Sequence, residues 1–214
     1  MTDKKPHGLL TGRKDRQRRL NEPRKGASAS SHVDFLVLAC RLLESSTEHA
    51  SQLNNNVSPY VLAGIPILIA MLRALLIDCE ILSMKAKPDL ECLKKDGDIR
   101  TILERFDISG DLRRDAEFLV EIRNEIIHPT HISIGSADNW PDYLRFIKDQ
   151  GLLNTTGKME SDYDFFHQLN SHRLFQWSFK VSREIAQIIL LKYKEETGFP
   201  LFEGFLSNFD SFEI

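Results

Sequence analysis

An apolar stretch at residues 60–77 constrains the fold of this chain more than any other feature of its sequence. The stretch is shorter than the roughly 20 apolar residues that a membrane-spanning helix needs. It also contains Arg73, and Gly64 and Pro66 interrupt it. Because an unpaired arginine is rare inside a membrane span, we expect no membrane association. The stretch instead predicts a helix that is buried on most of its sides inside a protein core.

Two further segments carry apolar residues at the three- and four-residue spacing of an amphipathic helix. The first begins at Ser31, which together with Asp34 has the form of a capping box. The second lies between a helix cap near Ser171 and a stop at Gly198. The two apolar stripes consist of Val33, Leu36, Cys40, Leu43 and Thr47, and of Leu174, Trp177, Val181, Ile185 and Ile188.

The remaining helices are predicted between these two segments. Ser58 and Pro59 have the order of an N-cap and a first helical residue, so they are expected to start the apolar helix. Pro66 is expected to kink that helix or to mark its true start, and Pro88 is expected to close it. Further helical segments are predicted at residues 88–95, 98–106, 111–127 and 140–147. No stretch alternates with period two, so we predict an all-α fold, a four-helix up-and-down bundle with short extra helices.

The charges divide the chain into a basic N-terminal arm and an acidic body. Residues 1–30 hold nine basic and three acidic side chains, a net charge of +6, whereas the rest of the chain has a net charge of −9. The arm is polar and rich in Gly and Pro, so we expect it to be flexible. It is either a phosphate-binding segment for nucleic acid or a solvated tail. The helical bundle is expected at residues 31–198, with an insertion at 130–170 before its last principal helix.

The C-terminal tail, residues 199–214, is rich in phenylalanine, with five of the thirteen in the chain. These aromatic side chains either pack as a flap on the chain's own core or form a hook for a partner, and burial is the commoner use of Phe.

The cysteines and the N-terminus indicate a reducing compartment. Cys40, Cys79 and Cys92 are widely spaced and odd in number, which argues against a disulfide framework and against a zinc ribbon. The basic N-terminus is not followed by the apolar region of a signal peptide. We therefore expect a cytoplasmic protein.

The helix predicted at residues 111–127 carries the chemistry. Its apolar side chains gather on one arc, and Arg123 falls inside that arc. A buried arginine costs several kcal/mol unless it is paired or reaches a wet cleft. Glu121, Asn124 and His128 form a neighbouring stripe, so Arg123, Asn124 and His128 are expected to converge near the helix end. The arc consists of Leu112, Ala116, Leu119, Ile122, Ile126 and Ile127.

This combination suits the cleavage of RNA. A histidine such as His128 can exchange a proton near neutral pH, and an arginine such as Arg123 binds phosphate in a bidentate manner. Cleavage needs a base that removes the proton of the 2′-hydroxyl and a cation that neutralises the phosphoryl oxygens. The residues alone leave alternatives open: His128 can simply cap the helix, and Arg123 can snorkel or pair with an acid of the next helix.

Residues 121–128, Glu-Ile-Arg-Asn-Glu-Ile-Ile-His, resemble the Arg-x4-His signature of the HEPN superfamily. The four-helix layout, with the motif at the end of the third principal helix, is similar too, and the resemblance covers residues 33–196. It implies a homodimer that brings two motifs together and acts as a metal-independent endoribonuclease, as in toxin–antitoxin, CRISPR-linked and antiphage systems. It further implies that His128 transfers the proton, Arg123 stabilises the phosphate, and Asn124 orients the substrate or the motif.

Other members of this superfamily have lost catalysis and bind RNA or nucleotides. The alternative function is therefore a non-catalytic helical module that binds RNA or protein. A third option is a purely structural dimer in which Arg123 forms an interface ion pair. Antitoxin-controlled relatives often carry a tyrosine two residues after the histidine, where this chain has Thr130. Regulation by nucleotide transfer to that tyrosine is therefore not expected, and any antitoxin or regulator stays open.

We expect no cofactor and no metal. His128 and His131 form an HxxH pair, but Pro129 breaks the helix that would align them. His167 and His172 are isolated in the sequence. The chain also has no Walker loop, GxGxxG or GxSxG motif.

Overall fold

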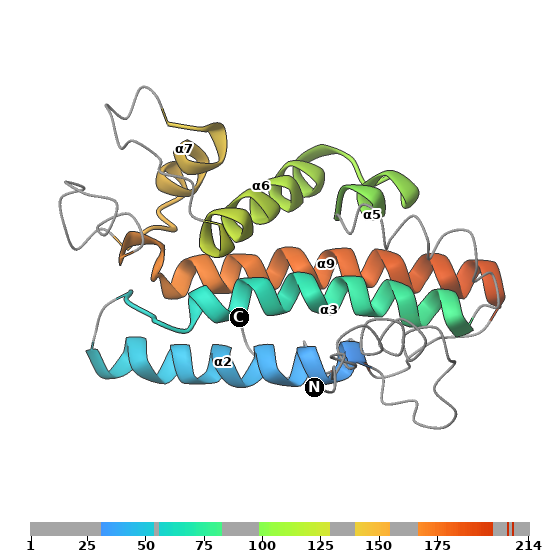
Figure 1. The fold of residues 1–214 in the computed structure, drawn as a ribbon, viewed down its shortest axis with the longest axis horizontal. Helices are drawn as coiled ribbons and strands as arrows, with labels where there is room; N and C mark the ends of the chain where they lie inside the picture. Colours follow the sequence, from blue (N-terminus) through green and yellow to red (C-terminus); the bar gives the residue numbers. More distant parts are fainter. Residues whose placement is uncertain are drawn as a thin grey trace, which may run out of the picture.

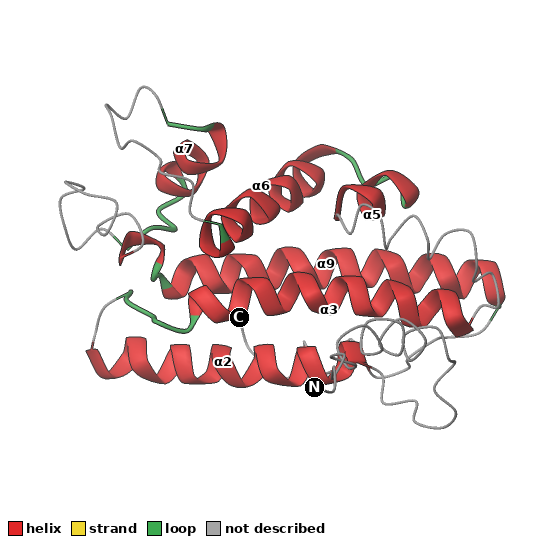
Figure 2. Ribbon diagram, viewed as in Figure 1, coloured by secondary structure: helices red, strands yellow, loops and turns green. Residues whose placement is uncertain are grey.

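The computed structural model describes residues 31–53, 56–82, 99–128, 140–154, 167–198, 205 and 207. Within these ranges the regular secondary structure is helical, with no strand, and an isolated β-bridge pairs Val57 with Ser171 (Figure 2). The predicted all-α class is confirmed. The helices are α2 (Ser31–Leu53), α3 (Val61–Leu82), α5 (Ile99–Arg105), α6 (Gly110–Ile127), α7 (Asp142–Asp149) and α9 (His172–Thr197).

Four long helices, α2, α3, α6 and α9, alternate in direction along the chain (Figure 1). Helix α3 lies between α2 and α9 and packs against both of them. Helix α6 crosses α3 and α9 on the side away from α2, and the short helices α5 and α7 pack against α6. Because α6 and α9 run in opposite directions, the C-terminal end of α6 and the N-terminal end of α9 lie at the same end of the molecule (Figure 1).

The apolar helix occupies the centre of the core, as predicted. Its buried side chains join one hydrophobic cluster with those of the other helices. By length and composition alone it could cross a membrane, since Val61–Cys79 has a mean hydropathy of 2.1. However, 56% of that window is buried inside the fold, and the core helix of a soluble protein has the same length and composition. Its fully buried large side chains include Ile65, Leu68, Met71, Leu72, Leu75 and Leu76.

The predicted start and stop of the last helix are confirmed. Ser171 is the N-cap of α9, and its hydroxyl oxygen accepts a hydrogen bond from the backbone N–H of Leu174. Gly198 ends the helix at φ 73°, a left-handed conformation that glycine adopts without strain. Local residue chemistry therefore sets both ends of α9.

The predicted start of α3 was wrong. The helix begins at Val61, whereas Ser58 and Pro59 lie outside it. Ser58 is instead fully buried, and its backbone N–H donates to the carbonyl oxygen of Asn170 at 2.9 Å. The contact with the residues that precede α9 therefore determines the conformation of this segment, which lies outside the helix. Pro66 lies inside α3 and does not mark its start.

Cys40 and Cys79 are the cysteines that the structure describes. Both are buried, and neither forms a disulfide. Burial, together with the nearby carboxylate of Glu44, raises the pKa of the Cys40 thiol to about 12. A thiol with so high a pKa is a packing residue and not a nucleophile.

One phenylalanine of the C-terminal tail packs on the core. Phe205 is only 3% exposed and meets the ring of His32 edge-on, with the ring centroids 4.9 Å apart. This residue therefore behaves as the expected flap. Several other predictions lie outside the described residues: the arm 1–30, the helix at 88–95, most of the insertion and of the tail, Cys92, Thr130 and His131.

Candidate functional site

Arg123, Asn124 and His128 lie at the C-terminal end of α6, where the side chains of Arg123 and Asn124 are hydrogen-bonded. The Arg123 Nη1 group donates a hydrogen bond to the side-chain oxygen of Asn124 at 3.0 Å. The backbone N–H of His128 donates to the backbone oxygen of Asn124 at 2.7 Å. His128 leaves the helix there, with φ −129° and ψ 71°, and its side chain is exposed.

Arg123 is half-buried and has no ion pair with an acid among the residues that the structure describes. Other arginines on the same helix differ in this respect. Arg113 pairs with Glu117 at 3.0 Å, and Arg114 pairs with Asp111 and Asp115. The described part of the chain therefore offers no support for an Arg123 bridge to a neighbouring helix. Among the described residues, its guanidinium is hydrogen-bonded to the neutral amide of Asn124.

The predicted core arc of α6 extends too far toward the end of the helix. The fully buried side chains are those of Ala116, Leu119, Val120 and Ile122. Ile127 was expected in the core but is 40% exposed. Ile126 still packs against the core while partly buried, so burial decreases toward the end of α6, and Arg123 lies there at half burial.

The acidic side chains near this helix end interact with residues of other helices. Glu121 forms an ion pair with Arg100 of α5 at 3.0 Å. Glu125, and more weakly Glu121, interacts with the buried Tyr143 of α7. Burial is the main cause that raises the pKa of Tyr143, and the two carboxylates raise it further. Glu121, which was placed on the same stripe as Asn124 and His128, is thus paired with Arg100 of another helix. The carboxylates are engaged with α5 and α7.

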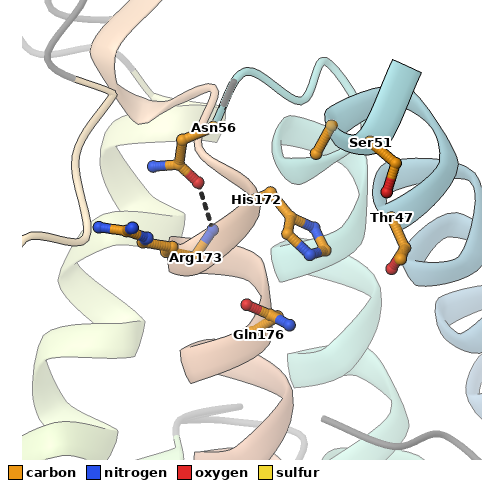
Figure 3. A pocket seen from close by; sticks show the side chains of 7 residues that line it. Thr47, Ser51, Asn56, His172, Arg173 and Gln176 are labelled. Atoms are coloured by element: carbon orange, nitrogen blue, oxygen red, sulfur yellow. Dashed lines mark hydrogen bonds between the residues drawn. The ribbon is translucent and has the colours of Figure 1, made fainter. Parts of the chain in front are cut away.

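A second polar site, which the sequence did not reveal, lies between the end of α2 and the start of α9. We refer to it as the α2–α9 groove, a cavity of about 430 Å³. In Figure 3 the His172 ring and the Gln176 amide turn toward Thr47 and Ser51 of α2, whereas the Arg173 side chain points away from them. The groove is lined by Thr47, Ala50, Ser51, Asn56, His172, Arg173 and Gln176.

The sequence position of His172 suggested an isolated side chain, but in the structure His172 has hydrogen-bonding neighbours. Its Nδ1 atom lies 2.7 Å from the hydroxyl oxygen of the buried Ser46, which in turn donates to the hydroxyl of Ser58 at 2.6 Å. Burial lowers the pKa of His172, which favours the neutral imidazole. No local signal could have predicted this network, because Ser46 and His172 are 126 residues apart.

No metal centre is evident in the described residues, since no three His, Cys, Asp or Glu side chains cluster there. His128 and His167 are both exposed.

Comparison with known proteins identifies no relative: no family model, no curated protein and no solved structure matches this chain.

Proposed function

We propose that this chain is a metal-independent endoribonuclease of the HEPN type, a cytoplasmic homodimer with Arg123, Asn124 and His128 at its catalytic site. The observation that carries the proposal is the half-buried guanidinium of Arg123, which bonds to a neutral amide and to no carboxylate among the described residues. A guanidinium in this state retains its charge for a phosphate. The exposed His128 follows at the end of the same helix.

The chemistry is a transesterification at phosphorus. The neutral imidazole of His128 takes the proton of a ribose 2′-hydroxyl, and the 2′-oxygen attacks the adjacent phosphorus. The bond from phosphorus to the 5′-oxygen breaks, and that oxygen takes a proton from the imidazolium of the second motif in the dimer. The products are a 2′,3′-cyclic phosphate and a 5′-hydroxyl. Arg123 neutralises the negative charge on the non-bridging oxygens, and Asn124 holds the guanidinium in place.

The experiment is incubation of the purified chain with a mixed-sequence RNA in the presence of EDTA. We expect cleavage with cyclic phosphate ends, and a rate lower by about 100-fold or more in His128→Ala, the usual effect of removing a general base. His167→Ala is the matched control, because His167 is also exposed and lies outside the motif. Cleavage by His128→Ala at the wild-type rate would refute the proposal.

The alternative is a non-catalytic module that holds RNA through its arm. The net charge of +6 over residues 1–30 favours it. A full-length variant with the nine basic residues of the arm replaced by Gln separates the two functions. An enzyme keeps its cleavage activity in this variant, whereas a binding module loses RNA affinity and has no cleavage activity to lose.

A toxin or antiphage defence role follows if the nuclease acts on cellular RNA. Expression of the wild-type chain in a bacterial host would then arrest growth, and His128→Ala would not. Growth curves and RNA integrity measured on the same cultures test this role. Equal growth with both chains would count against it.

A further inference from the structure

The α2–α9 groove has the size and the polarity of a ligand site. Its volume of about 430 Å³ lies within the range of small-molecule pockets. Among the described residues, its lining contains hydroxyl, amide and imidazole groups and Arg173, but no carboxylate. A polar site of this kind suits a ligand that forms several hydrogen bonds and carries no positive charge.

The contacts of His172 favour a proton on its Nδ1 atom. The single hydroxyl proton of Ser46 is donated to Ser58, so it is not available to His172. With the Ser46 proton on Ser58, a proton on Nδ1 of the imidazole completes the 2.7 Å contact between Ser46 and His172. In the neutral ring Nε2 is then left with a lone pair. His172 lines the groove, so Nε2 is the hydrogen-bond acceptor that the ring offers there.

The other groups of the groove differ in what they offer. The Asn56 side chain lines the groove, but its polar groups are already hydrogen-bonded within the protein. Its side-chain oxygen accepts from the Arg173 backbone N–H at 2.9 Å, and its amide nitrogen donates to the Ser171 hydroxyl at 2.7 Å. Thr47 donates its hydroxyl proton to the Leu43 carbonyl oxygen, so its oxygen can only accept from a ligand. Gln176 makes no hydrogen bond among the described residues, so its amide can both donate and accept.

A ligand for this groove must therefore present hydrogen-bond donors and acceptors side by side. The edge of a nucleobase has this pattern, with N–H donors next to ring-nitrogen or carbonyl acceptors. Arg173 also lines the groove, and its side chain, which points away from α2 in Figure 3, is a cation beside the groove that has no ion pair within the described ranges and suits a phosphate. The groove also lies at the start of α9, at the same end of the molecule as the last turn of α6, while α6 itself packs on the side of α9 away from α2 (Figure 1).

We propose that the α2–α9 groove binds a nucleobase edge, with His172 Nε2 accepting a hydrogen bond from the base and Gln176 pairing beside it. The source of the base is an unpaired nucleotide of the RNA whose phosphate is bound at Arg123. This source rests on the proposed ribonuclease function. The same base chemistry in a free nucleotide is the other source, and the experiment distinguishes the two.

The experiment follows the imidazole proton signals of the full-length chain by NMR during titration with AMP, CMP, GMP, UMP and a short single-stranded RNA. We expect a saturable shift of the His172 signal with at least one monophosphate and with the RNA, in the wild type and in His128→Ala. His172→Asn keeps a side-chain donor for Ser46 and removes the Nε2 acceptor. His172→Asn has no His172 signal, so affinity is measured by calorimetry for this variant, for Gln176→Leu and for the wild type. A lost hydrogen bond should weaken binding about tenfold.

Gln176→Leu is the second variant, because Gln176 does not belong to the buried Ser46–Ser58–His172 network. It should also weaken binding about tenfold while the fold is unchanged by circular dichroism. The proposal is overturned if no probe shifts His172 at about 10 mM, where a millimolar dissociation constant is detectable. Wild-type affinity in both variants overturns it equally. Binding of monophosphates without binding of RNA overturns RNA as the source. Base binding without RNA cleavage would overturn the ribonuclease proposal and leave the base-binding groove in place.

Discussion

Gly64 of α3 and Phe175 of α9 meet at a contact that leaves no room for a side chain on the glycine. A Cβ atom built on Gly64 would lie 2.2 Å from Cζ of the Phe175 ring. Phe175 is fully buried, so its ring has no space to move aside. The glycine therefore allows α3 and α9 to approach closely near the N-terminal end of α9. This contact holds the first turns of α9, and with them the α2–α9 groove, against the core.

We expect Gly64→Ala to destabilise the fold by about 1–3 kcal/mol, the usual cost of overpacking a core. The loss should appear although alanine is the better helix former by about 1 kcal/mol. Urea unfolding measures it. Gly64→Ala combined with Phe175→Leu should recover part of the loss, and Ala63→Ser, at an exposed position of the same helix, should change little. Equal unfolding midpoints for Gly64→Ala and the wild type would contradict the contact.

Asn124→Asp tests whether RNA cleavage requires an Arg123 guanidinium that is not paired with a carboxylate. The substitution conserves the shape of the side chain but places a carboxylate 3.0 Å from the guanidinium, at the position of the amide oxygen. The ion pair should neutralise Arg123 and lower RNA cleavage by about 100-fold, the usual effect of losing a charge stabiliser. Single-turnover cleavage measures this effect. Arg113→Ala is the control on the same helix, because Arg113 already pairs with Glu117. A full rate in Asn124→Asp would exclude Arg123 as the phosphate-binding cation.

Ser171→Ala should lower the free energy of unfolding by about 1–2 kcal/mol, the cost of losing an N-cap. Ser171 accepts from the Leu174 N–H at the first turn of α9, and also from the Asn56 amide at 2.7 Å. In the variant the Leu174 N–H loses this acceptor, and the Asn56 amide keeps only its longer bond to the Leu153 carbonyl oxygen at 3.4 Å. Thermal unfolding measures the change, with Ser51→Ala at an exposed position of α2 as the control. An unchanged midpoint in Ser171→Ala would show that the cap contributes nothing.

The sequence predicted the elements that depend on local chemistry. Ser171 and Gly198 mark the ends of α9 through a side-chain cap and a left-handed glycine, and both signals act within a few residues. The burial of the apolar helix follows in the same way from its composition. The start of α3 could not be predicted locally, because Ser58 bonds to Asn170 and to Ser46, which are distant in the sequence.

The candidate site could be predicted only in part for the same reason. The spacing of Arg123 and His128 brought them to one helix end, but the sequence could not show that Asn124 would hold the guanidinium. The engagement of Glu121 by Arg100 of α5 could not be foreseen either. His172 appeared isolated because its partner Ser46 belongs to the first helix. Hydrogen-bond networks between segments that are distant in the sequence can be identified only from the folded structure.

The stability of the protein should fall with pH below the ordinary pKa of histidine, because burial lowers the pKa of His172 in the folded chain from 6.5. Above that pH His172 is neutral in both states and contributes no slope. As the pH falls toward the lowered pKa, the unfolded chain binds a proton that the folded chain does not bind, so unfolding becomes more favourable. Urea unfolding between about pH 5 and pH 8 should show this decline in the wild type, and a smaller decline in His172→Asn, which has no group that titrates there. His167→Asn, at an exposed histidine, should keep the wild-type slope. Parallel profiles for the wild type and His172→Asn would show that folding does not lower the pKa of His172. That result would remove the support for a neutral Nε2 acceptor in the groove.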